Sequence, residues 1–102
     1  ESEYRVEVEE KRWECSERLA KKELQVAEFY AKRLAWEAVR RRSSGLIQDF
    51  PTSDHVVDAK LLQVQALVEL KQLEDATPLW QDVQSSAPER AEKLRKKYPE
   101  LP

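Results

Sequence analysis

The chain has 102 residues, and its 18 basic and 20 acidic side chains leave a net charge of -2. A chain of this length forms one domain or part of one, and its balanced charge provides no overall field to attract nucleic acid. Cys15 is the only cysteine, so no disulfide can form within the chain, and no run of about eighteen apolar residues predicts a membrane span. A single glycine among many Leu, Ala, Glu, Lys and Arg residues predicts an all-α fold.

The first predicted helix runs from Ser2 to Arg33, where neither proline nor glycine interrupts the chain. At about 1.5 Å per residue it would be roughly 45 Å long, which exceeds an average globular helix. Apolar residues at helical spacing predict its buried stripe: Tyr4, Val8, Cys15, Leu19, Val26 and Tyr30. The charged start without methionine suggests a fragment of a longer protein.

The second predicted helix runs from Ala35 to Phe50. Pro51 ends it, because a proline disfavours the α conformation at the residue before it. Gly45 lies inside this helix at a cost of about 1 kcal/mol relative to alanine. That cost predicts the close approach of a neighbouring backbone, and an unoptimised surface position is the alternative.

Three shorter helices complete the prediction. The third begins at a Ser53 or Asp54 cap and runs to about Leu73. The fourth covers about Asp75 to Gln84, with Pro78 confined to its first turn. The fifth, Glu89 to Lys97, follows Pro88 and has so few apolar residues that fraying is expected.

Short connections make successive helices antiparallel neighbours, so the chain divides into a hairpin over residues 1–52, a second hairpin over 53–87 and a capping helix and tail over 88–102. Small, aromatic and proline residues recur at matching spacings in the two hairpins, as in tetratricopeptide repeats. Ser43 stands where an aromatic is expected, and an unrelated helical bundle is the alternative. The residues interpreted as structural are Ala27, Tyr30, Trp36, Pro51, Trp80 and Pro88.

No pattern in the chain predicts catalysis, a metal site or a cofactor. One cysteine and one histidine, forty residues apart, do not supply a zinc site, and a single glycine excludes a glycine-rich phosphate loop. The run from Arg40 to Arg42 is a local basic cluster with three interpretations: a solvated helix face, an anchor for an acidic protein partner, or a nucleic-acid contact. Consecutive helical residues point about 100° apart, so at most two of these arginines serve one partner.

A longer pattern spans the first hairpin and the start of the second. It consists of Arg18-Leu19-Ala20, Glu23, Val26-Ala27-Glu28-Phe29-Tyr30, Arg33, Ala35-Trp36, Ala38-Val39, Arg42, Gly45, Asp49-Phe50-Pro51 and Asp58-Ala59. With these residues the chain resembles the C-terminal part of the BamD family of outer-membrane assembly lipoproteins, from residue 1 to about 83. The resemblance implies the last two of five repeats.

The resemblance also implies a function and a place in the cell. It implies a non-catalytic periplasmic scaffold that docks onto a POTRA domain of the barrel subunit BamA. Arg42 matches an arginine that the family presents to an acidic residue of that domain, and Arg33 and Asp49 match neighbouring polar positions. Membrane attachment would be through an N-terminal lipid anchor outside this chain, so Cys15 is not the lipidation site.

Two other functions stay open at the level of sequence. One is a generic tetratricopeptide adaptor, such as a cell-envelope coordinator or a chaperone-docking module. The other is the helical accessory domain of an enzyme. A signal peptide with a lipid-modified cysteine upstream would favour the outer-membrane assembly scaffold, whereas a cytosolic start would favour the adaptor.

Overall fold

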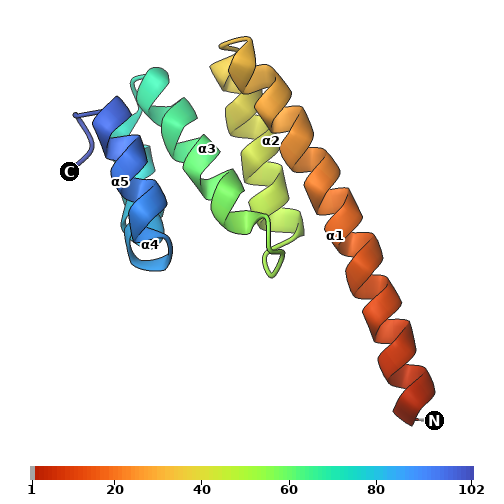
Figure 1. Ribbon diagram of the computed structural model, residues 1–102. Helices are drawn as coiled ribbons and strands as arrows, with labels where there is room; N and C mark the ends of the chain where they lie inside the picture. The colour runs from red at the N-terminus through yellow and green to blue at the C-terminus, as the bar shows by residue number, and fades with distance from the viewer. Residues whose placement is uncertain (1) are drawn as a thin grey trace.

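The computed structural model describes residues 2–102, with side chains from residue 5 onward. Within these residues it has five helices and no strand, which confirms the predicted all-α fold. The helices are α1 (Ser2–Lys32), α2 (Trp36–Asp49), α3 (Val56–Glu69), α4 (Leu73–Ser86) and α5 (Pro88–Lys97). Figure 1 shows successive helices running antiparallel, with α1 at one edge of the array and α4 and α5 at the other.

The two hairpins turn by the same backbone geometry. Leu34 after α1 and Lys71 after α3 both have positive φ, 59° and 63°. At each turn, two successive backbone N–H groups donate to carbonyls at the end of the helix. The first belongs to the residue with positive φ: Leu34 N–H donates to Ala31 O at 3.0 Å, and Lys71 N–H donates to Val68 O at 3.1 Å. The N–H of the following residue donates to a carbonyl further back in the helix and completes a Schellman cap, so neither helix end needs glycine.

The same spacing of 37 residues relates the buried positions of the two hairpins. Leu34 and Lys71 are 37 residues apart, and so are the pairs of side chains that fill the hairpin interiors. Each of these side chains is at most 1% exposed: Ala27 and Val64, Val39 and Ala76, Ser43 and Trp80, Leu46 and Val83. A shared period in both turns and cores marks the hairpins as structural repeats.

Two apolar clusters hold the array together, and α3 contributes to both. The smaller lies among α1, α2 and the start of α3: Leu24, Leu46, Val56 and Ala59. The larger lies among the rest of α3, α4, α5 and the tail: Val64, Leu67, Val68, Ala76, Trp80, Val83, Ala91, Tyr98 and Leu101. Because α3 is shared, the two hairpins form one packed array.

The buried face of α1 differs from the predicted stripe. Cys15 is exposed and Leu19 is 52% exposed, so the prediction was wrong at these two residues, whereas Val8, Val26 and Tyr30 are half-buried. The residues that pack inward are Ala20, Leu24 and Ala27. Small alanines let α2 approach α1 closely, which outweighs the larger area of the outward aliphatic side chains. Tyr4 lies outside the described side chains.

The N-terminal part of α1 continues past the end of the other helices (Figure 1). There Val6 is 53% exposed and Trp13 is 43% exposed, and together with three glutamates they line a shallow hollow on the same side as the buried alanines. Nearer the array, the Glu17 carboxylate accepts a hydrogen bond of 3.2 Å from Asp54 N–H.

The boundaries of α3 and α4 differ from those predicted. The first residue before α3 is His55, which makes no side-chain cap, while the Ser53 hydroxyl accepts a bond from His55 N–H within the preceding loop. α3 ends at Glu69 and not at Leu73, because the chain turns at Lys71. α4 therefore begins at Leu73 and places Pro78 beyond its first turn. Pro78 is exposed, so the carbonyl group that it leaves unpaired faces solvent.

The C-terminal segment is more firmly packed than its helix sequence suggests. Ala91 of α5 is buried, and after the helix Tyr98 and Leu101 fold back into the larger cluster. Trp80 is 1% exposed, and its indole N–H donates to Pro102 O at 2.9 Å. The tail residues, and not the helix alone, supply the apolar contacts that hold α5, while fraying of the helix stays a prediction.

Candidate partner-binding face of α2

One face of α2 carries Arg42, Gly45 and Asp49. Their spacing of three and four residues places them in line along the helix, over about two turns or roughly 10 Å. Arg42 and Asp49 are both exposed. The face therefore presents a cation and an anion at its two ends, with a residue without a side chain between them.

Gly45 lies over open space. A Cβ atom added there would have no neighbour within 4 Å, and its φ is not in the left-handed region. The expected approach of a neighbouring backbone is therefore wrong within this chain. The result is a gap in the side-chain layer between Arg42 and Asp49, where the α2 backbone is uncovered.

Arg42 is connected to α1 by a loose ion pair. Its Nη1 atom lies 3.7 Å from Glu23 Oε2, and the two side chains are 49% and 39% exposed. That distance exceeds an N–H···O hydrogen bond, so the guanidinium is oriented by Glu23 while its donors remain free. Glu23 is one of the residues that carry the family resemblance. Nothing in its spacing from Arg42 in the sequence indicated the contact.

Arg33 lies at the other end of α2, in the turn after α1. Its guanidinium sits 3.5 Å from the centre of the Phe29 ring and donates to Phe29 O at 3.2 Å. Phe29 is itself 48% exposed and meets Tyr30 edge to face at 5.4 Å. Arg33 therefore forms an exposed cation–π pair, separated from Asp49 by about the length of α2, roughly 20 Å.

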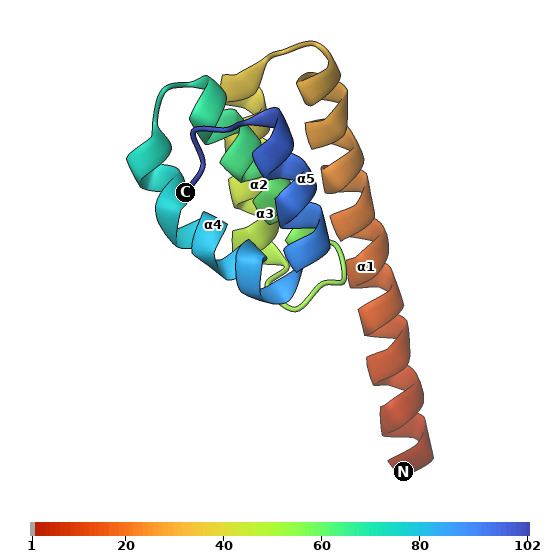
Figure 2. The ribbon, with the colours of Figure 1, turned by 60° about the vertical axis from the view of Figure 1, so that its left-hand side comes forward.

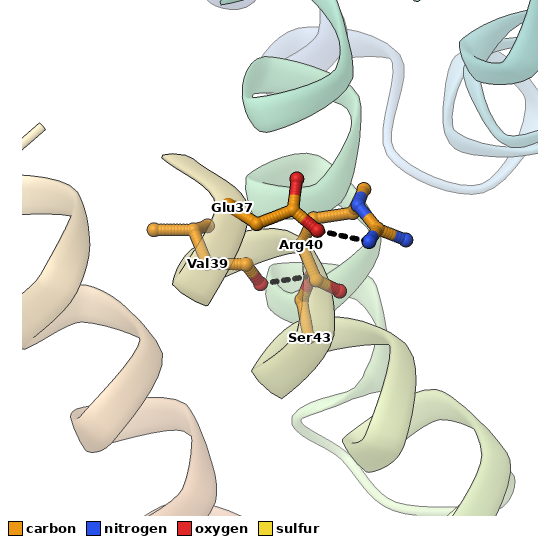
Figure 3. Close-up of polar contacts among 4 residues, drawn as sticks. All are labelled: Glu37, Val39, Arg40 and Ser43. Atoms are coloured by element: carbon orange, nitrogen blue, oxygen red, sulfur yellow. Dashed lines mark hydrogen bonds and ion pairs between the residues drawn. The ribbon is translucent and has the colours of Figure 1, made fainter. Parts of the chain in front are cut away.

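The other arginines of the basic cluster are placed differently. Arg40 forms an ion pair with Glu37 one turn earlier on the same helix (Figure 3). The hydrogen bond from Arg40 lowers the pKa of Glu37 below its usual value, and Glu37 in turn raises the pKa of Arg40. Arg41 is exposed on a face about 100° away from Arg42. Arg42 is thus the member of the cluster that shares a face with Gly45 and Asp49.

Beneath the Glu37–Arg40 pair, Ser43 takes the buried position that an aromatic fills in the other hairpin. Its hydroxyl donates to Val39 O at 2.7 Å, and its side chain is completely buried (Figure 3). The bond satisfies the hydroxyl inside its own helix, so the position needs no external polar partner.

The residues interpreted as structural occupy two kinds of place. Ala27 and Trp80 are buried in the helix interfaces. Tyr30 and Trp36 are half-buried on either side of the first turn, and the Tyr30 carbonyl accepts the capping bond from Ala35 N–H at 3.0 Å.

The two prolines stand at equivalent helix boundaries. Pro51 follows the end of α2, and Pro88 is the first residue of α5, where its missing N–H costs no helical bond. Both rings are exposed, so their contribution is to chain direction and not to apolar burial.

The described part of the chain contains no group of three or more His, Cys, Asp or Glu side chains placed to hold a metal ion. None of the described helices combines the length and the apolar character that crossing a membrane requires.

Comparison with known proteins gives a match to a family and matches to individual proteins. Residues 1–78 match the YfiO family, described as outer membrane lipoprotein. The outer membrane protein assembly factor BamD of Haemophilus influenzae is 40% identical over 48 residues, which cover 47% of this chain and 18% of that relative. The chain thus spans less than a fifth of the curated relative. No solved structure matches the chain.

Proposed function

The chain belongs to the outer membrane lipoprotein family, and we propose that it is a non-catalytic scaffold in the assembly of outer-membrane proteins. Family membership confirms the resemblance noted in the sequence and locates the chain in the periplasm in association with the outer membrane. In this proposal the membrane attachment is a lipid anchor carried upstream of residue 1.

The proposed partner is a POTRA domain of the barrel subunit BamA, bound on the α2 face that carries Arg42, Gly45 and Asp49. The observation that carries this proposal is the state of Arg42, which is half-exposed and held by Glu23 at 3.7 Å without a hydrogen bond. A guanidinium in this state can donate two parallel bonds to an incoming carboxylate. Because Glu23 already restricts the orientation of the Arg42 side chain, that side chain loses less conformational entropy when a partner binds.

The gap at Gly45 supports the same face. Because no atom of the chain covers the position of a Cβ there, a partner can bring its backbone close to α2 between the two charged side chains. Asp49 would then pair with a basic or amide group of the partner. Arg33 and Phe29 would extend the contact at the far end of α2, where both are exposed.

The test is a calorimetric titration in which a soluble POTRA domain is added to the chain or to one of its charge-reversal variants. Arg42→Glu is expected to weaken binding by at least about tenfold, because it replaces an attraction with a repulsion at the contact. Arg41→Glu is the matched control, since it makes the same charge change one residue away on another face, and we expect a change within about twofold.

Melting temperatures separate binding from folding. Both arginines are exposed, so both variants should melt within a few degrees of the parent chain. Equal affinity of the Arg42 variant and the parent would reject this face as the docking site. Equal weakening by both variants would mean that general charge, and not the Arg42 contact, drives binding.

A further inference from the structure

A second surface lies between α3 and α5, away from the α2 face. Figure 2 shows α5 packed beside α3, and a shallow groove follows their junction. Leu61 of α3 and Leu94 of α5 form its floor, and both are half-buried against the cluster around Trp80. Three basic side chains of α5 form its rim: Arg90, Lys93 and Lys97.

The rim residues share one face of α5. Arg90, Lys93, Leu94 and Lys97 recur at spacings of three and four, so their side chains are aligned along the groove. Arg90 forms an ion pair with Asp58 of α3, which fixes that end of the groove. Lys93 and Lys97 are exposed, and neither is in an ion pair with any side chain that the structure describes.

The charge of α5 contrasts with that of the whole chain. Its ten residues, PERAEKLRKK, have five basic and two acidic side chains, whereas the full chain has a net charge of -2. The positive field is therefore concentrated on α5 and attracts anionic groups to the groove at short range.

We propose that the α3–α5 groove binds an acidic amphipathic helix of a partner protein. An apolar side chain of that helix packs on Leu61 and Leu94, while its carboxylates pair with Lys93 and Lys97. Helices that lie in a groove combine apolar anchors and flanking charges in this way. The site is separate from the proposed POTRA face, and α5 lies wholly beyond the residues that match the family.

The spacing of the rim defines the sequence expected in the partner. Lys93 and Lys97 are one turn apart, about 6 Å. A partner helix therefore matches the groove when two acidic residues, four positions apart, flank a leucine or similar residue.

The recessed floor favours a protein segment over a lipid surface. Leu61 and Leu94 are half-buried at the bottom of the groove, so they do not project far enough to enter a bilayer. A helix brings its own side chain into the groove and so covers both leucines.

The probe is a synthetic amphipathic helix about 20 residues long, with leucines on one face and glutamates four positions apart beside them. It carries a fluorophore and is titrated with the full chain while its anisotropy is followed. We expect saturable binding that weakens at least about tenfold when Lys93→Glu and Lys97→Glu are combined. Replacing the glutamates of the probe by glutamine should have a similar effect.

Lys21→Glu combined with Lys22→Glu is the matched control. Both lysines are exposed on α1, so this double variant has the same net charge while the groove is unchanged. We expect it to bind the probe within about twofold of the parent. If the reversed groove variant loses helicity, Lys93→Gln with Lys97→Gln removes both charges without adding repulsion and should still weaken binding by at least about threefold.

Three outcomes would overturn the proposal. The first is equal affinity of the groove variant and the control for the probe. The second is that vesicles containing phosphatidylglycerol bind the chain through Lys93 and Lys97 while the helical probe does not. The third is that the chain alone self-associates in sedimentation experiments and the groove variant abolishes this, which would identify a second copy as the occupant.

Discussion

The two hairpins have the same turn and period but different interiors. Ser43 in the first and Trp80 in the second are 37 residues apart, occupy equivalent positions and are both buried. Ser43 lies on α2, which packs against α1 and α3, and α3 carries the fully buried small residues Ala59 and Ala66. At Trp80 the neighbours are α5 and the tail, and an indole fills the space between them. A repeat thus adapts one position to what covers it, either the next hairpin or a terminal helix.

The largest expected effect on stability is at Trp80, and it tests whether the two equivalent positions differ. Trp80→Ala should lower the free energy of unfolding by about 3–5 kcal/mol, since it removes a buried aromatic and leaves a cavity. Ser43→Ala should change it by less than about 1 kcal/mol, because the lost hydroxyl bonds only within its own helix. Urea unfolding followed by circular dichroism measures both. Similar losses for the two variants would show that the equivalent positions do not differ in this way.

The next effect concerns Tyr98, which fastens the tail to the second hairpin. Its hydroxyl donates to Glu69 Oε2 at 3.1 Å. Tyr98→Phe should therefore reduce stability by about 1 kcal/mol near neutral pH. Unfolding in urea at pH 7 provides this value, and a variant as stable as the parent would show that the bond contributes nothing.

The pH dependence of the same variant gives a second readout. Burial raises the pKa of Tyr98 above its usual value; the contact with Gln65 opposes this rise, and the contact with Glu69 adds to it. A raised pKa means that the unfolded chain releases this proton first, so the stability from Tyr98 is present below about pH 10 and is lost as the pH rises further. The difference between parent and Tyr98→Phe should then shrink above about pH 10. A difference that grows with pH would contradict the raised pKa.

The smallest effect is a gain in stability in the first hairpin. Gly45→Ala should stabilise the chain by about 0.5–1 kcal/mol, because alanine favours a helix and its Cβ enters open space. If the partner approaches α2 at this gap, the same change should weaken POTRA binding. Thermal melting and calorimetry on one protein sample test both effects. A variant that is more stable and binds equally well would show that the gap serves no contact.

The sequence predicted the helices well where local chemistry decides. The uninterrupted α1 and the stop at Phe50-Pro51 follow from proline geometry and from residues that favour helix. The turn after α3 escaped prediction because Lys71 adopts a positive φ that usually signals glycine or asparagine.

Prediction of which face of each helix is buried was less successful. The inward side of α1 was assigned in part to Leu19 and Cys15, whereas Ala20 and Leu24 pack inward beside Ala27, which the repeat spacing had already marked as structural. Counting apolar area misjudges a helix whose neighbour must come close, since there the small side chain is the one that fits. The same limit applies to the candidate site. The resemblance indicated Arg42, but only the structure revealed its contact with Glu23 and the open position at Gly45.

The most direct test of the POTRA proposal is amide hydrogen exchange of the chain with and without a saturating POTRA domain. Binding on the α2 face should slow exchange in α2 around Arg42 to Asp49 and in α1 near Glu23, with no change in α5. Protection confined to α4 and α5 under saturating conditions would contradict it, because the contact would then lie on the second hairpin.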